Sequence, residues 1–167
     1  MIPAAPVLTE PSETAHALAR LALTVRLDDL PAAVVAQAKR ILRDTVGVML
    51  GGAALPEIRN LAAIAPGLAA GGASLFGTGT RAAAHMAALV NGTGGVSLEL
   101  DEGNQFAVNH PGVHIIPALW ALAEEEGASG AALLEALVAG YEIAVRVGAA
   151  TRLRGPVHPF GTHTIIG

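Results

Sequence analysis

Acidic, amide and imidazole side chains gather in one part of the sequence, residues 99–117. Three carboxylates lie there within four positions, at Glu99, Asp101 and Glu102, and two imidazoles follow at His110 and His114. Carboxylates this close repel one another unless they are solvated, paired, or shared with a cation or a proton. Histidine can take up or release a proton near neutral pH. The stretch therefore predicts a site of proton transfer, and the alternative is a solvated surface loop.

A second histidine followed by proline, His158-Pro159, repeats the pattern of His110-Pro111. If the two segments converge beside the acidic residues, one group can remove a proton next to a carboxylate while another protonates the leaving group. A metal site of two histidines and a carboxylate is a weaker alternative, because the spacing matches no compact ligand motif. The sequence has no cysteine and no nucleophile elbow, which argues against thiolate ligands, a cysteine nucleophile and a serine triad.

The composition favours a single folded domain with few charges. Hydrophobic residues make up 52% of the 167 positions and charged residues 14%, which is typical of a chain with a substantial core. The net charge of −4 and the lack of a lysine and arginine cluster argue against nucleic acid binding. The most apolar stretches, 41–55 and 131–150, both carry charged residues, so we expect no membrane association. The absence of cysteine and of a recognisable signal peptide leads us to expect a cytoplasmic protein.

Helices are expected to position the polar stretch, because the rest of the sequence places apolar residues at helical spacing. We expect helices over about residues 12–23, 31–50, 57–65, 81–100, 113–127 and 129–152, and an extended segment at about 74–77. The third should end before Pro66-Gly67, and the glycines of 91–95 should interrupt the fourth and indicate a tight helix contact or a bend there. Glu124, Glu125 and Glu126 close the fifth, where carboxylates oppose the helix dipole, so we expect them to be solvated. The predicted fold class is all-α, a multi-helix domain.

Several short motifs occur together in this sequence. The most specific are Leu100-Asp101-Glu102-Gly103-Asn104, His110-Pro111-Gly112, Gly140-Tyr141-Glu142 and His158-Pro159, and they are joined by Asp28-Asp29-Leu30-Pro31 and Asp44-Thr45-Val46-Gly47. In this combination the sequence resembles the MmgE/PrpD family. Members of that family include 2-methylcitrate dehydratase, cis-aconitate decarboxylase and iminodisuccinate epimerase. The resemblance covers essentially the whole chain.

The resemblance implies a fold, a substrate class and a set of site residues. The fold is an all-helical domain over residues 1–167, and the substrate is a small-molecule di- or tricarboxylate. Neither a metal nor an organic cofactor is implied. The catalytic residues carried over are Asp101, His110 and His158, and the substrate-binding residues are Glu99, Asn104 and His163.

Two departures from the family pattern shape the functional expectation. Residues 99–103 read Glu-Leu-Asp-Glu-Gly, where the family often has Asp-x-Asp-Asp-Thr. Family members are also much longer, and their lid domain, catalytic lysines and C-terminal helices are not within these 167 residues. We therefore expect the N-terminal part, or a split subunit, of a dehydratase-like lyase or isomerase, in a homo-oligomer or in a hetero-oligomer with a chain that carries the lid. The alternative is a non-catalytic helical module that serves assembly or regulation of such a complex.

Overall fold

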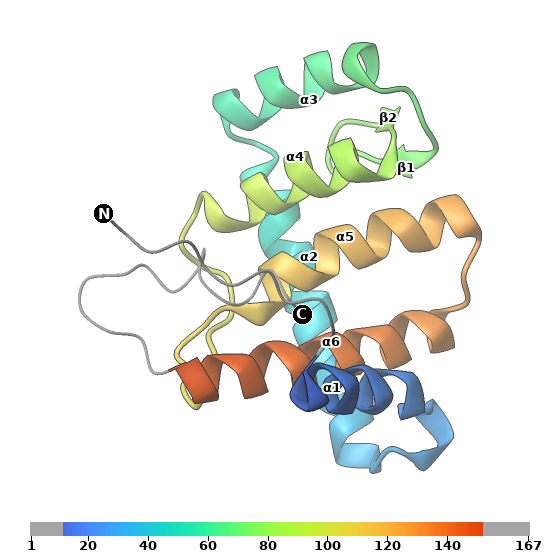
Figure 1. Ribbon diagram of the computed structural model, residues 1–167. Helices are drawn as coiled ribbons and strands as arrows, with labels where there is room; N and C mark the ends of the chain where they lie inside the picture. The colour runs from blue at the N-terminus through green and yellow to red at the C-terminus, as the bar shows by residue number, and fades with distance from the viewer. Residues whose placement is uncertain (1–11, 152–167) are drawn as a thin grey trace, which may run out of the picture.

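The computed structural model describes residues 12–151, which fold into six α-helices and one short hairpin (Figure 1). The helices are α1 (Glu13–Thr24), α2 (Ala32–Gly52), α3 (Pro56–Leu68), α4 (Ala84–Val96), α5 (Pro111–Glu126) and α6 (Gly130–Thr151), and a 3-10 turn, Leu27–Asp29, precedes α2. Strands β1 (Ala73–Ser74) and β2 (Arg81–Ala82) pair antiparallel, with Ala73 opposite Ala82. The prediction of an all-α fold is confirmed.

Local sequence signals set several helix ends. The hydroxyl of Ser12 accepts the N–H of Ala15 at 3.2 Å at the start of α1, and the hydroxyl of Ser129 accepts the N–H of Ala132 at 3.1 Å at the start of α6. The predicted end of the third helix was wrong, because α3 continues through Pro66 to Leu68. Pro66 stands in the last turn, where the loss of one backbone donor is tolerated more easily than in mid-helix.

Helix α2 crosses behind α4, α5 and α6, and α5 lies between α4 and α6 (Figure 1). Helix α1 packs on α6, and α3 packs on α4. One core joins α2, α5 and α6 and includes Met49, Ile116 and Leu137, and a second core between α3, the hairpin and α4 also receives Ala121 of α5. Burial of each large apolar side chain contributes about 1.5–3 kcal/mol. Because α5 belongs to both cores, its position is fixed from two sides.

Glycines bring α2 and α4 into direct backbone contact. A Cβ atom at Gly52 would overlap the carbonyl oxygen of Gly94, and a Cβ atom at Gly95 would lie 2.7 Å from Cγ2 of Val113. Helix α4 continues without a break through residues 91–95, so the expected interruption was wrong, whereas the tight helix contact expected at these glycines is confirmed. Close packing of the two helices offsets the cost of glycine in a helix, about 0.5–1 kcal/mol relative to alanine.

The acidic end of α5 is exposed, as expected, but two of its carboxylates also have protein partners. Glu124 accepts hydrogen bonds from the backbone N–H of Ser74 at 2.6 Å and from its hydroxyl at 2.8 Å, and Glu125 accepts the N–H of Ala84 at 2.8 Å. Burial alone would raise the pKa of Glu124, but the hydrogen bonds from Ser74 and the positive charge of Arg81 lower it. These carboxylates anchor the hairpin and the first turn of α4.

Within residues 12–151, no single helix combines the length and the apolar content needed to cross a membrane. Helices α2 and α3 meet those criteria only when taken as a pair, and they are bent by 94° relative to each other.

Candidate functional site

Residues 97–110 form the loop between α4 and α5, and two asparagines shape it. The N–H of Asn104 donates to the carbonyl of Asn109 at 2.7 Å, and the N–H of Asn109 donates back at 3.2 Å. The side-chain oxygen of Asn104 accepts the N–H of Ala107 at 3.0 Å, and the buried amide of Asn109 donates to the carbonyl of Ala144 on α6 at 3.1 Å. The loop is therefore closed on itself and tied to α6 just before it enters α5.

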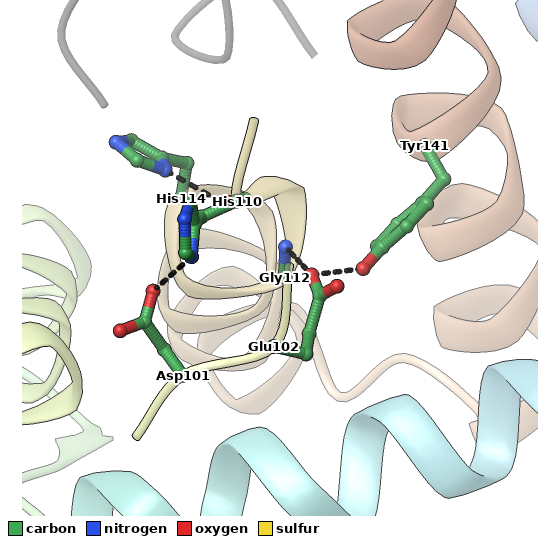
Figure 2. A network of polar contacts seen from close by, with 6 residues as sticks. All are labelled: Asp101, Glu102, His110, Gly112, His114 and Tyr141. Atoms are coloured by element: carbon green, nitrogen blue, oxygen red, sulfur yellow. Dashed lines mark hydrogen bonds and ion pairs between the residues drawn. The ribbon is translucent and has the colours of Figure 1, made fainter. Parts of the chain in front are cut away.

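Asp101 and His110 approach each other from the two halves of this loop (Figure 2). Nδ1 of His110 lies 3.1 Å from Oδ2 of Asp101, and the side chain of Asp101 is only 1% exposed, against 30% for His110. A buried carboxylate is costly unless a positive charge or a polar hydrogen lies beside it. The contact therefore favours a proton on Nδ1 of His110. In the neutral imidazole this tautomer leaves the lone pair on Nε2, the atom that can accept a proton from a substrate.

His110 also occupies the N-cap position of α5, and its backbone carbonyl contacts His114 in the helix. Nδ1 of His114 lies 2.9 Å from the carbonyl oxygen of His110. Because a carbonyl oxygen can only accept, Nδ1 of His114 carries the proton in this contact. Pro111 takes the first helical position, where its missing N–H costs nothing. The backbone that carries the His110 ring is thus fixed on its helical side.

Glu102 turns away from Asp101 and reaches the opposite side of the loop (Figure 2). Its Oε1 accepts the N–H of Gly112 at 2.6 Å in the first turn of α5, and it also accepts the hydroxyl of Tyr141 on α6. A carboxylate suits this place because the first turn of a helix has unpaired N–H groups and the positive end of the helix dipole. Burial, followed by the negative charge of Glu102 and the hydrogen bond to it, raises the pKa of Tyr141. Tyr141 therefore stays protonated and acts as the donor.

Gly112 leaves the space that the Glu102 carboxylate needs. A Cβ atom at this position would lie 2.8 Å from Oε1 of Glu102 and 2.9 Å from Oγ1 of Thr45. Thr45 is a fully buried residue of α2, and its hydroxyl has no hydrogen-bond partner among residues 12–151. Side chains of α2, α6 and the loop therefore meet at the N-terminus of α5.

The structure brings together two of the predicted site residues, Asp101 and His110. Asn104 instead uses its side chain to shape the loop, and Glu99 is exposed, with a backbone φ of 51°. His158 and His163 lie outside residues 12–151, so the expected convergence of the two histidine–proline segments stays a prediction. The catalytic and substrate-binding roles assigned from the sequence also stay predictions.

Sequence reasoning counted Glu102 among the clustered carboxylates without a role of its own, and it gave no site role to Thr45, Asn109 or Tyr141. Glu102, Thr45 and Tyr141 belonged to recognised motifs, and this was the signal that could have drawn attention to them. Thr45 and Asn109 are buried polar residues, 0% and 1% exposed. Burial of a polar side chain depends on the tertiary fold, and no local pattern marks it.

Three cavities of the described residues are lined by Glu102 or His114, which belong to the same polar network as the Asp101–His110 pair (Figure 2). A cavity of about 650 Å³ opens between α2 and the loop and is lined in part by Glu102. Cavities of about 300 Å³ and 490 Å³ are both lined by His114. Neither Asp101 nor His110 lines any of these three cavities, and of the two side chains Asp101 is buried and His110 is partly exposed. Within residues 12–151, no three histidine, aspartate or glutamate side chains are grouped as metal ligands would be.

Comparison with known proteins places the chain in a family. Residues 16–167 match the family model described as the MmgE/PrpD N-terminal domain. A curated relative, the cis-aconitate decarboxylase-like protein oryM of Aspergillus oryzae, is 35% identical over 130 residues, which cover 73% of this chain and 27% of that protein. The matched part is thus little more than a quarter of the relative's length. On the match over residues 16–167, the chain belongs to the MmgE/PrpD family.

Proposed function

We propose that this chain is the N-terminal part of a lyase or isomerase in which Asp101 and His110 form an acid/base pair that acts on a di- or tricarboxylate. The observation that carries the proposal is the 3.1 Å contact between Nδ1 of His110 and the buried carboxylate of Asp101. Membership of the MmgE/PrpD family supports it, as does similarity to a protein named cis-aconitate decarboxylase-like.

The proposed chemistry moves a proton at a carbon next to a substrate carboxylate. In a dehydration or an epimerisation, Nε2 of His110 takes that proton, and Asp101 stabilises the imidazolium that forms. The electron pair left on carbon then forms a double bond as the C–O bond breaks and a second acidic group protonates the leaving hydroxyl to give water, or the carbon accepts a proton from such a group on the opposite face. In a decarboxylation, carbon dioxide leaves, the carbon keeps the electron pair of the broken bond, and the imidazolium protonates it.

The rest of the proposed site comes from outside the described residues. The Asp101–His110 pair lines none of the three cavities described above. Catalysis next to a carboxylate needs groups that bind the substrate and stabilise developing negative charge. We expect these groups in further sequence of the same protein or in a partner chain, and we expect the reaction to need no metal or organic cofactor.

The test is a product assay by proton NMR on the complete protein, together with any partner chain that co-purifies. A panel of di- and tricarboxylates is incubated with the wild type, His110→Gln and Asp101→Asn. His85→Gln is the matched control, since His85 is an exposed histidine near the start of α4, away from the loop. We expect turnover of at least one carboxylate, and a fall of about 10²- to 10⁴-fold in kcat for His110→Gln, the range of general acid–base catalysis.

Two results would overturn this proposal. One is full activity of His110→Gln with the substrate that the wild type converts. The other is a folded, complete assembly that turns over no carboxylate on the panel, which would favour the non-catalytic helical module.

A further inference from the structure

Among residues 12–151, no hydrogen bond from the backbone holds the Asp101 carboxylate in place. In this part of the chain no second side chain donates to its oxygens either, and its charge contact is with Nδ1 of His110. The side chain is nonetheless 1% exposed. A carboxylate in such a place keeps its direction only if the backbone that carries it is fixed by something else.

The neighbouring residue, Glu102, provides that fixed point. Its carboxylate accepts the N–H of Gly112 in the first turn of α5 and the hydroxyl of Tyr141 on α6. Figure 2 shows Asp101 and Glu102 extending to opposite sides of the loop, one toward His110 and the other toward Tyr141. Holding the Glu102 side chain therefore limits the rotation and translation of the peptide that presents Asp101.

We propose that Tyr141 is a positioning residue for the Asp101–His110 pair, and that it acts through Glu102. Tyr141 ties the loop to α6, and α6 is packed in the core that also holds α5. The hydroxyl touches neither Asp101 nor His110 in the network of Figure 2, so its effect on the pair is indirect. This inference rests on the proposed function only in taking the Asp101–His110 pair as the reacting unit.

The first test reads the tautomer of His110 rather than activity. Ring-nitrogen-labelled histidine is incorporated into the protein, the His110 signal is assigned by its loss in His110→Gln, and nitrogen chemical shifts are recorded at alkaline pH. We expect the wild type to carry its proton on Nδ1, because the Asp101 carboxylate lies beside that atom. Asp101→Asn should remove this preference, and Tyr141→Phe should weaken it.

The path through Glu102 is tested by combining variants. In the Asp101→Asn background, Tyr141→Phe should cause no further change in the His110 shifts. Gly112→Ala is a second way to disturb Glu102, since the added Cβ would lie 2.8 Å from its Oε1, and it serves if Tyr141→Phe does not fold. In the active enzyme, Tyr141→Phe should lower kcat by about 10- to 100-fold with little change in KM, the cost of misplacing a reacting group.

The matched control is Ser74→Ala. Ser74 also donates a hydroxyl to a glutamate, Glu124, that accepts a backbone N–H as well, but at the far end of α5. This variant removes the same kind of hydrogen bond and should leave the His110 shifts unchanged.

The outcomes separate failure of this inference from failure of the proposed function. If Asp101→Asn changes the His110 shifts and folded Tyr141→Phe does not, the positioning role is wrong and the pair stands. A Tyr141→Phe effect that persists in the Asp101→Asn background contradicts the path through Glu102. If Asp101→Asn itself leaves the His110 shifts unchanged, there is no functional pair for Tyr141 to position, and both proposals fall.

Discussion

Tyr141→Phe removes one hydroxyl from a half-buried network and keeps the ring that packs against the core. The lost hydrogen bond ends on the Glu102 carboxylate, which keeps the N–H of Gly112 as a partner. Hydrogen bonds to charged groups contribute about 1.5–3 kcal/mol, and no polar group is left wholly unpaired by the change. We therefore expect a loss of about 1.5–3 kcal/mol in the free energy of unfolding near neutral pH.

The pH dependence of this loss follows from the direction of the Tyr141 pKa shift. Burial and the Glu102 carboxylate raise the pKa in the folded state above the ordinary value of 10.0, so the unfolded chain releases the phenol proton first as pH rises. The stability that the hydroxyl contributes is fully present below pH 10.0 and declines as pH rises above it. The difference between wild type and Tyr141→Phe should therefore shrink above pH 10.0.

Two assays check this reasoning. Urea unfolding of both proteins from about pH 8 to about pH 11 gives the difference directly. The chain contains one tyrosine, so the near-ultraviolet absorbance of tyrosinate reports Tyr141 alone, and we expect it to appear only as the protein unfolds. A folded protein that forms tyrosinate with a midpoint near 10.0 would refute the assignment, as would an unfolding difference that grows with pH.

Three further predictions concern packing, acid stability and the loop. Gly52→Ala should lower the free energy of unfolding in urea by more than about 3 kcal/mol, because the new Cβ would overlap the carbonyl of Gly94. Gly47→Ala is the control: its Cβ would have nothing within 4 Å, so it should raise the free energy of unfolding by about 0.5–1 kcal/mol. Equal effects of the two variants would contradict the close contact between the helices. Glu124 has a lowered pKa, so the stability it contributes is present above its ordinary pKa of 4.5 and is lost as pH falls through the lower pKa of the folded state. In an acid titration the free energies of unfolding of wild type and Glu124→Gln should therefore converge. A difference between them that widens in acid would contradict this. Asn109→Ala removes the buried hydrogen bond to the Ala144 carbonyl and should lower the free energy of unfolding by about 1–3 kcal/mol. Amide hydrogen exchange in residues 104–109 should become faster. Exchange in the variant as slow as in the wild type would show that the loop does not depend on this bond.

The helices could be predicted from the sequence because their signals are local. Apolar spacing and the serine caps predicted the bounds of α1, α2, α5 and α6 to within about two residues of those in the structure. The errors came where tertiary contacts overrode propensity. Glycines 94 and 95 lowered the expectation of a continuous α4, and the tight helix contact that they also indicated is what lets α4 approach α2 and α5.

The candidate site could be predicted in part. The density of acids and imidazoles in residues 99–117 marked the correct loop, yet spacing alone did not show which carboxylate meets His110. Asp101 and Glu102 are adjacent and chemically alike, but in the structure Asp101 contacts His110 and Glu102 accepts the N–H of Gly112 on the opposite side of the loop. That choice depends on α6, since Tyr141 lies 39 positions away in the sequence. No local sequence pattern predicts a contact between residues this far apart.

The most direct test of the central claim is deuterium incorporation from heavy water at the carbon next to a carboxylate, followed by NMR on the complete protein with a substrate from the panel. Proton transfer through His110 predicts that the wild type and Glu124→Gln place deuterium there, while His110→Gln and Asp101→Asn do so at least about 10²-fold more slowly. Incorporation at the wild-type rate by a folded Asp101→Asn or His110→Gln protein would show that this pair does not carry the reaction.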